Sequence, residues 1–173
     1  METMRCIGLP AQTDVQCRVL VLGSMPGIAS LQAAQYYAHP RNRFWPLMAA
    51  LSGMDSALPY PQRLRSLHAH GLGLWDVIGQ CDRRGSLDAD IVRGSEVVNP
   101  LPALIRQLPR LRGIACNGGT AFAAWNRHVR PLLDSHAAEL PVWSLPSTSP
   151  ANAGWSLERL TAAWRPVAVA LAQ

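Results

Sequence analysis

Four apolar runs, separated by helix-like segments, most limit the folds that this chain can adopt. They read CRVLVLG (17–23), LGLWDVI (72–78), RGIACNG (112–118) and PVWSLPS (141–147). The first three lack the polar–apolar alternation of a half-exposed strand, so they are predicted to be covered on both faces. Strands of this kind that alternate with helices indicate parallel βαβ units and therefore a layered α/β fold.

Helices are expected between and after these strands, over the ranges 42–51, 62–70, 100–108, 119–129 and 156–172. Asn42 and Asn99 are capping residues at two of the helix starts, and Pro166 is expected to kink the last helix. No repeat or linker interrupts the 173 residues. The chain is therefore predicted to form a single domain over 1–173, with residues 1–16 as an N-terminal lead-in.

Composition narrows the chemistry further. All sixteen basic residues are arginine, so no lysine is present to form a Schiff base, and the net charge of +5 fits a polyanionic partner. The four cysteines form no CxxC pair; they are expected to be buried, reduced thiols, with no metal, Fe–S cluster or other cofactor. No apolar run is long enough for a bilayer and the N-terminus lacks a signal-peptide layout, so the expected location is cytoplasmic.

Each predicted strand ends in a polar or glycine-rich cluster: GSMPG (23–27), Asp76, NGG (117–119) and PSTSPAN (146–152). In an open parallel sheet, ligands bind outside the carboxyl ends of the strands, so these clusters are predicted to meet in one crevice. The GSMPG turn is either a backbone cradle for an anion or carbonyl oxygen, or a plain strand-to-helix turn. It fits neither the Walker nor the G-x-G-x-x-G pattern.

The segment YYAHPRNRFWP (36–46) interleaves aromatic residues with arginine, a mixture that suits nucleic acid because rings stack on bases and guanidinium groups pair with phosphates. A structural interpretation stands beside this one. Phe44 and Trp45 would be core residues of the following helix, Asn42 its cap, and His39 a residue that holds the turn.

Three further positions carry the same two interpretations. Asp76 is either an acid–base group or a residue that orders its loop. Asn117 precedes two glycines and suits a turn, yet its amide also offers the donor and acceptor needed to read a base edge. The hydroxyl groups of residues 147–149 suit phosphate binding, or belong to an ordinary Ser/Pro loop.

Taken in order, GSMPG, YYAHPRNRFWP, LWDV…RRGSLDADI and LPSTSPANA resemble the motifs of the uracil-DNA glycosylase superfamily, and above all its hypoxanthine-DNA (deoxyinosine) glycosylase branch. The segment AHPRNRFW is also similar to the AHPxNRFW segment of the mismatch-specific uracil glycosylases. The resemblance covers roughly residues 17–165. It implies a three-layer α/β/α sandwich around a short, mainly parallel four-stranded sheet, and an enzyme that flips a damaged base from DNA and hydrolyses its N-glycosidic bond.

The resemblance also implies roles for single residues. Asn42 matches the catalytic position. The base-binding pocket would comprise Gly23, Ser24, Met25, Pro26, Gly27, Asp76, Asn117 at the base edge, and Tyr37 stacked on the flipped base. DNA would contact Arg41, Arg43, Ser147, Thr148, Ser149 and Asn152. Many members carry Asp or Asn where this chain has Met25, and others carry His or Asn in place of Leu145, so the departures favour hypoxanthine over uracil.

The sequence therefore predicts a monomeric, monofunctional DNA glycosylase that removes a deaminated base, hypoxanthine first, and leaves an abasic site. One alternative is a glycosylase for uracil or for a broad set of deaminated bases. Another is a non-catalytic module that binds damaged DNA or nucleotides. A small hydrolase that uses Asp76 and His39 ranks last, because no nucleophile lies at a recognisable elbow.

Overall fold

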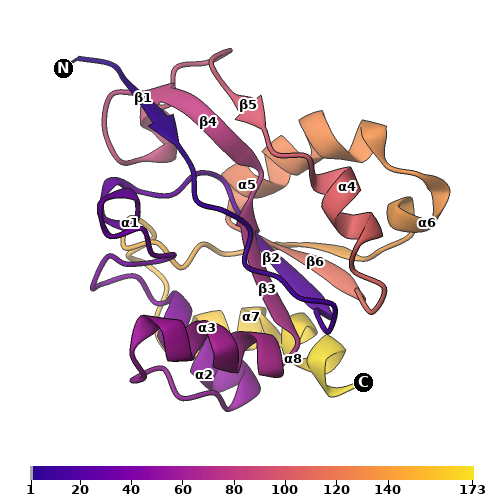
Figure 1. The fold of residues 1–173 in the computed structure, drawn as a ribbon. Helices are drawn as coiled ribbons and strands as arrows, with labels where there is room; N and C mark the ends of the chain where they lie inside the picture. Colours follow the sequence, from indigo (N-terminus) through magenta and orange to yellow (C-terminus); the bar gives the residue numbers. More distant parts are fainter. Residues whose placement is uncertain (1) are drawn as a thin grey trace.

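The four apolar runs form one parallel sheet in the computed structural model, which describes residues 2–173 (Figure 1). Its strands lie in the order β3-β2-β6-β7, and all three pairings are parallel. Their bounds are β2 (Val19–Gly23), β3 (Leu72–Asp76), β6 (Gly113–Asn117) and β7 (Val142–Leu145). Every residue of β2 and β6 is buried, as their unbroken apolar sequence predicted.

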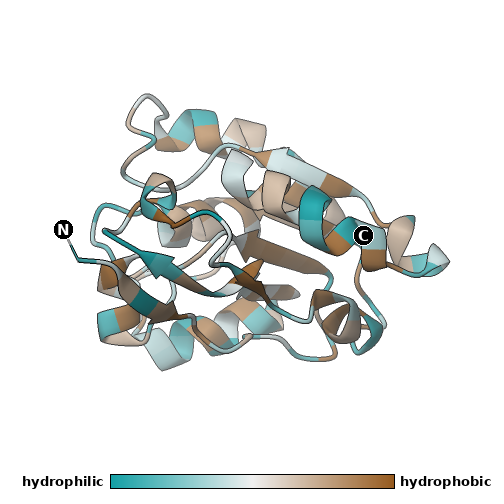
Figure 2. Ribbon diagram, turned by 90° about the horizontal axis from the view of Figure 1, so that it is seen from above, coloured by the Kyte–Doolittle hydropathy of each residue, from teal (hydrophilic) through white to brown (hydrophobic). Residues whose placement is uncertain are grey.

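Helices cover both faces of this sheet. One layer holds α2 (Phe44–Ser52), α3 (Tyr60–Ala69), α7 (Leu157–Ala163) and α8 (Arg165–Ala172); the other holds α4 (Leu101–Arg106), α5 (Gly119–Ala124) and α6 (Ser135–Ala138) (Figure 1). Successive side chains of β2 point to opposite cores: Val19 and Val21 join the first, Leu20 and Leu22 the second. Figure 2 shows the central strands as mainly hydrophobic. The predicted three-layer α/β/α sandwich is confirmed.

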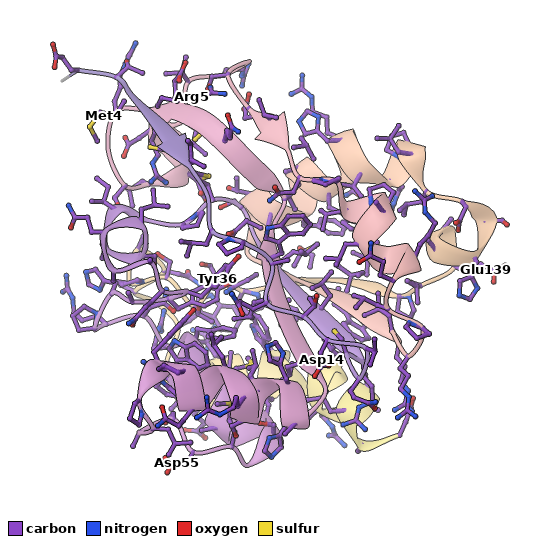
Figure 3. All side chains as sticks on the ribbon, viewed as in Figure 1. Met4, Arg5, Asp14, Tyr36, Asp55 and Glu139 are labelled. Carbon is purple, nitrogen blue, oxygen red and sulfur yellow. The ribbon has the colours of Figure 1, made fainter. Side chains whose placement is uncertain are left out.

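A second, antiparallel sheet was not predicted. It comprises β1 (Met4–Ile7), β4 (Ile78–Arg83) and β5 (Val97–Val98), in the order β1-β4-β5. The predicted strand 72–78 is in fact two, because the chain leaves the parallel sheet after Asp76 and enters the antiparallel one at Ile78. The lead-in segment supplies β1, whose Arg5 lies at the periphery and pairs with Asp82 at 3.2 Å (Figure 3).

The helices depart from the predicted ranges in ways that have local causes. A short helix, α1 (Ile28–Ala33), follows the GSMPG turn and was not predicted. The segment 119–129 is α5 followed by a π-helical turn, Trp125–Val129. The last helix is broken at Trp164, with Pro166 in the first turn of α8, where its missing N–H costs nothing. Every helix of the described chain is too short or too polar to traverse a bilayer.

Candidate active site

The carboxyl ends of the parallel strands open into a cleft of about 990 Å³. Its walls include all four strand-end clusters, which therefore meet as predicted, together with Tyr37, His39, Arg41 and Asn42 of the aromatic–arginine segment. A wall that the sequence did not assign is the loop 86–89. Its residues lie within the RRGSLDADI stretch, one of the motifs that resemble those of the uracil-DNA glycosylase superfamily.

The Gly23–Gly27 turn is clamped from outside by the 86–89 loop. Ser24 Oγ donates to the carboxylate of Asp88 at 2.5 Å, and Ser86 Oγ accepts from the first helical N–H, that of Ile28, at 2.9 Å. The Met25 side chain packs with Cys6, Ile78 and Cys81 against the second sheet. Met25 is therefore a hydrophobic anchor for the turn, which explains how an inert side chain can occupy the middle of a polar site.

Asp76 is a buried carboxyl group on the wall of the cleft. It is only 4% exposed, and its Oδ2 atom is buried without a hydrogen-bond partner among residues 2–173. Burial, and secondarily the negative charge of Asp88, raise its pKa from 3.8 to about 7. The backbone of Asp76, in contrast to its carboxyl group, has a partner: Asn99 Nδ2 donates to the Asp76 carbonyl at 2.8 Å. An unpaired buried acid in a cleft is typical of a functional group rather than a loop-ordering one.

Gly23 leaves the space that the Asp76 carboxyl occupies. A Cβ at this position would lie 2.4 Å from Asp76 Oδ1 and 3.4 Å from the Tyr37 hydroxyl. We expect Gly23→Ala to lower the free energy of unfolding by about 1–3 kcal/mol, since buried neighbours must move. Chemical denaturation measures the change. Gly154→Ala, where nothing lies within 4 Å, is the matched control and should stay near wild type; equal effects would contradict the steric argument.

Tyr37 and Asn117 are joined across the cleft. Asn117 Nδ2 donates to the Tyr37 hydroxyl at 3.2 Å and to Thr148 Oγ1 at 3.0 Å, while its Oδ1 accepts from the Thr148 N–H at 3.0 Å. The Asn117 amide thus uses both of its hydrogens and one lone pair within the protein. It therefore holds the loop at Thr148 and has no free donor with which to read a base edge. The Tyr37 ring stacks on Phe44, with 4.0 Å between ring centroids.

Two hydrogen bonds hold the turn before α2. His39 Nδ1 accepts from the Arg41 N–H at 3.1 Å, and Asn42 Oδ1 accepts from the Phe44 N–H at 2.9 Å. His39 therefore has the turn-holding role, and Asn42 precedes the N-cap residue, Arg43, by one position. Asn42 nevertheless lines the cleft, and its Nδ2 group donates to no acceptor within residues 2–173. The Asn42 side chain can therefore accept a hydrogen bond from the start of α2 through its oxygen and donate one into the cleft through its nitrogen.

Two of the residues that were predicted to contact DNA, Thr148 and Arg43, make contacts within the protein instead. Thr148 is fully buried, so its hydroxyl is not a surface contact for DNA. Arg43 Nη2 donates to the carbonyls of Ser149 and Asn152 at 3.1 and 2.9 Å, so this guanidinium fastens the loop and is not part of the cleft wall. Ser147, Ser149, Asn152 and Arg41 line the cleft without being fully buried, and they remain candidates for contact with a ligand.

The described residues contain no cluster of side chains that could bind a metal ion. Among residues 2–173, no three His, Cys, Asp or Glu side chains are grouped as metal ligands. All four cysteines are buried and unpaired, and burial raises the pKa of both Cys17 and Cys116 to about 12. The Cys17 and Cys116 thiols are therefore protonated at neutral pH.

Comparison with known proteins identifies the family. Residues 10–168 match the model described as the uracil DNA glycosylase superfamily. The chain belongs to this superfamily. A relative from Methanosarcina acetivorans named hypoxanthine DNA glycosylase is 37% identical over 153 residues, which cover 88% of this chain and 91% of the relative. A relative of the same name from Methanosarcina barkeri is 36% identical over 116 residues, covering 66% and 72%.

A solved structure agrees with the fold. The solution NMR structure of a candidate uracil DNA glycosylase from Methanosarcina acetivorans superposes with a TM-score of 0.81 and 33% identity, covering 98% of this chain and 100% of that one. The superfamily, its hypoxanthine-DNA glycosylase branch and the fold class were all predicted from the sequence, and these comparisons confirm them.

Proposed function

We propose that this protein is a monofunctional DNA glycosylase that releases hypoxanthine from DNA and leaves an abasic site. The whole of 1–173 would act as one catalytic domain, as a monomer in the cytoplasm. The observation that carries the proposal is the pairing, in one cleft, of an asparagine amide with a buried, unpaired carboxyl group, in a chain whose relatives are named hypoxanthine DNA glycosylases.

Asn42 would position the attacking water. Cleavage of the glycosidic bond builds positive charge on the sugar, and the enzyme must place a nucleophile beside it. An amide does not titrate usefully, so Asn42 would not be a general base. Its oxygen has a second lone pair beyond the bond to Phe44, and its nitrogen is free, so the two atoms together can orient one water molecule.

Asp76 would act on the departing base. Negative charge develops on the base as the bond breaks, and a donor that is already in place stabilises it. With a pKa of about 7, the Asp76 carboxyl is largely protonated in mildly acidic solution and about half protonated at neutral pH, and its protonated form can donate a hydrogen bond. Tyr37 supplies a neutral ring, because burial and the Asp76 charge raise its pKa above the ordinary tyrosine range. This pocket would accept an uncharged purine and favour its departure.

The base that is released tests the proposal directly. Duplex oligonucleotides containing hypoxanthine, uracil or xanthine are incubated with the protein, and the free bases are identified by mass spectrometry. We expect hypoxanthine to be released fastest, because a mispaired base costs least to flip and the residues for uracil chemistry are absent at Met25 and Leu145. Release of uracil first would support the broad-range alternative. Binding of damaged duplex without release of any base would support the non-catalytic module.

The absence of lysine makes a second prediction about the reaction. A glycosylase that also cuts the strand forms an imine with an amine, and the chain offers none on a side chain. We expect borohydride treatment during turnover on hypoxanthine-containing DNA to trap no covalent adduct, and the strand to remain intact until it is treated with alkali. An adduct that survives acetylation of the N-terminal amine would contradict this prediction.

A further inference from the structure

Tyr37 is held in the cleft wall by a strained backbone. Its φ is 54°, and among residues 2–173 no other non-glycine residue of the cleft wall has a positive φ. A bulky residue in this conformation persists only where its surroundings fix it. On one side the Tyr36 N–H donates to the Tyr60 hydroxyl at 3.0 Å. On the other the Ala38 N–H donates to Ser30 Oγ at 3.1 Å. The fold therefore accepts strain in order to place the Tyr37 side chain in the cleft.

The Tyr37 hydroxyl lies beside the turn that borders the base pocket. A Cβ on Gly23, the first residue of that turn, would stand 3.4 Å from the hydroxyl oxygen. The ring stacks on Phe44 with 4.0 Å between the centroids, and this contact fixes the direction of the C–O bond. Burial, and secondarily the charge of Asp76, hold the pKa of Tyr37 above the ordinary tyrosine range. At neutral pH the group is therefore a neutral hydroxyl with one hydrogen to donate.

Asn117 decides where that hydrogen points. A backbone N–H can only donate, so the atom of Asn117 that faces the Thr148 N–H at 3.0 Å is the oxygen, Oδ1. Flipping the amide would lose this bond, and Nδ2 therefore faces the Tyr37 hydroxyl at 3.2 Å as a donor. The Tyr37 oxygen accepts with a lone pair, so its own hydrogen is directed away from Asn117. This hydrogen has no acceptor within residues 2–173.

A fixed donor without an acceptor selects the ligand that enters the pocket. Deamination of adenine replaces an exocyclic amino group, which donates, with a carbonyl oxygen, which accepts. An O–H that faces an amino group leaves two donors opposed, whereas one that faces a carbonyl is satisfied, and such mismatches discriminate strongly. We propose that Tyr37 is a specificity-determining residue of this protein: its hydroxyl donates to the carbonyl oxygen that deamination creates, and so excludes adenine. The inference rests on the proposed glycosylase function, and it moves base reading from the Asn117 amide to the tyrosine that this amide orients.

The test removes the hydroxyl and the base oxygen separately. Single-turnover release is measured from duplexes that contain hypoxanthine or unsubstituted purine, which carries hydrogen in place of the oxygen. Tyr37→Phe should slow the release of hypoxanthine about tenfold or more and leave the release of purine within about twofold, because purine offers the hydroxyl no oxygen. Tyr60→Phe is the matched control, since the Tyr60 hydroxyl also accepts from an N–H but lies outside the cleft wall. It should keep the wild-type preference for hypoxanthine over purine.

Asn117→Asp reverses the hydroxyl with little change in side-chain shape. One carboxylate oxygen can still accept from the Thr148 N–H, and the other accepts from the Tyr37 hydroxyl, whose hydrogen then no longer points at the base. The preference for hypoxanthine over purine should fall as far as it does in Tyr37→Phe. Combining the two substitutions should lower this preference no further, because both remove the same contact. The preference is the readout because the added charge alters the release of both bases.

Binding supplies a readout that needs no cleavage. Fluorine at the 2′ position of the sugar opposes the positive charge of the transition state, so fluorinated duplexes keep their base and their dissociation constants can be measured. Wild type should bind hypoxanthine more tightly than purine, and adenine least, whereas Tyr37→Phe should bind hypoxanthine and purine more nearly alike. The cost of opening each duplex is common to both proteins and cancels in this comparison.

Two results would overturn the proposal: equal slowing of both bases by Tyr37→Phe, since Tyr37 would then only shape the pocket, or rates and affinities that do not change. If wild type releases no base at all, the proposed function fails. The binding comparison still decides in that case whether the Tyr37 hydroxyl recognises the oxygen.

Discussion

Asn42→Ser is expected to slow single-turnover release of hypoxanthine by about 10²–10³-fold, the range that follows the loss of one well-placed transition-state hydrogen bond. Serine has a shorter side chain and offers one rotatable hydroxyl in place of the fixed pair of amide groups, so it would no longer hold a water against the sugar. The hydroxyl can still accept from the Phe44 N–H, as Asn42 Oδ1 does now at 2.9 Å. The free energy of unfolding should therefore change by less than about 1 kcal/mol.

The control for this experiment is the same substitution at a remote asparagine. Asn126 lies in the π-helical turn Trp125–Val129 and is not part of the cleft wall. Asn126→Ser should leave the rate of base release at the wild-type value. Rapid-quench kinetics with excess enzyme measure the chemical step, and thermal unfolding measures stability for both variants. If Asn42→Ser releases hypoxanthine at the wild-type rate, Asn42 is a structural residue of the turn before α2.

The parallel sheet could be predicted because each of its strands has a recognisable sequence pattern of its own. Strands that are covered on both faces must be apolar along their whole length, as β2 and β6 are. The antiparallel sheet could not be predicted, because β5 has only two residues and β1 is mostly exposed. Strands that short and that exposed have no pattern of their own; each forms because it pairs with β4.

The position of the cleft could be predicted from the strand ends, but the hydrogen-bond partners of its side chains could not be predicted. Arg43 looked like a phosphate ligand because it lies among aromatic residues, yet its guanidinium closes on carbonyls more than a hundred residues away, at Ser149 and Asn152. Asn117 looked like a base reader, yet Thr148 takes up its amide. Sequence shows which groups are available, whereas their use within the protein depends on long-range contacts that no local pattern encodes.

Asp76 should make the stability of the protein depend on pH in a direction opposite to that of most carboxylates. Its pKa is 3.8 in the unfolded chain and about 7 in the folded protein, so the folded state holds a proton that the unfolded chain releases between these values. The contribution of Asp76 to the free energy of unfolding is full below about pH 4 and is lost as the pH rises to about 7. Asp76→Asn cannot ionise, so at pH 8 it should be more stable than wild type by on the order of 2–4 kcal/mol, and at pH 4 about equal. Denaturant titrations at the two pH values measure this difference.

The same proton should control the reaction. If the neutral carboxyl donates to the departing base, the single-turnover rate of wild type falls about tenfold per pH unit above its pKa, because a carboxylate there would repel the charge on the base. Asp76→Asn keeps a donor at every pH, so its rate should be lower than that of wild type at pH 6 and flat up to pH 9. The titratable groups that interact with Asp76 are Asp88, Tyr36 and Tyr37, and Asp88 carries the charge that helps to raise the pKa of Asp76. Asp88→Asn should therefore move the wild-type break to lower pH. Parallel profiles for wild type and Asp76→Asn would show that the Asp76 proton takes no part in base release, and the raised pKa would then be a consequence of burial alone.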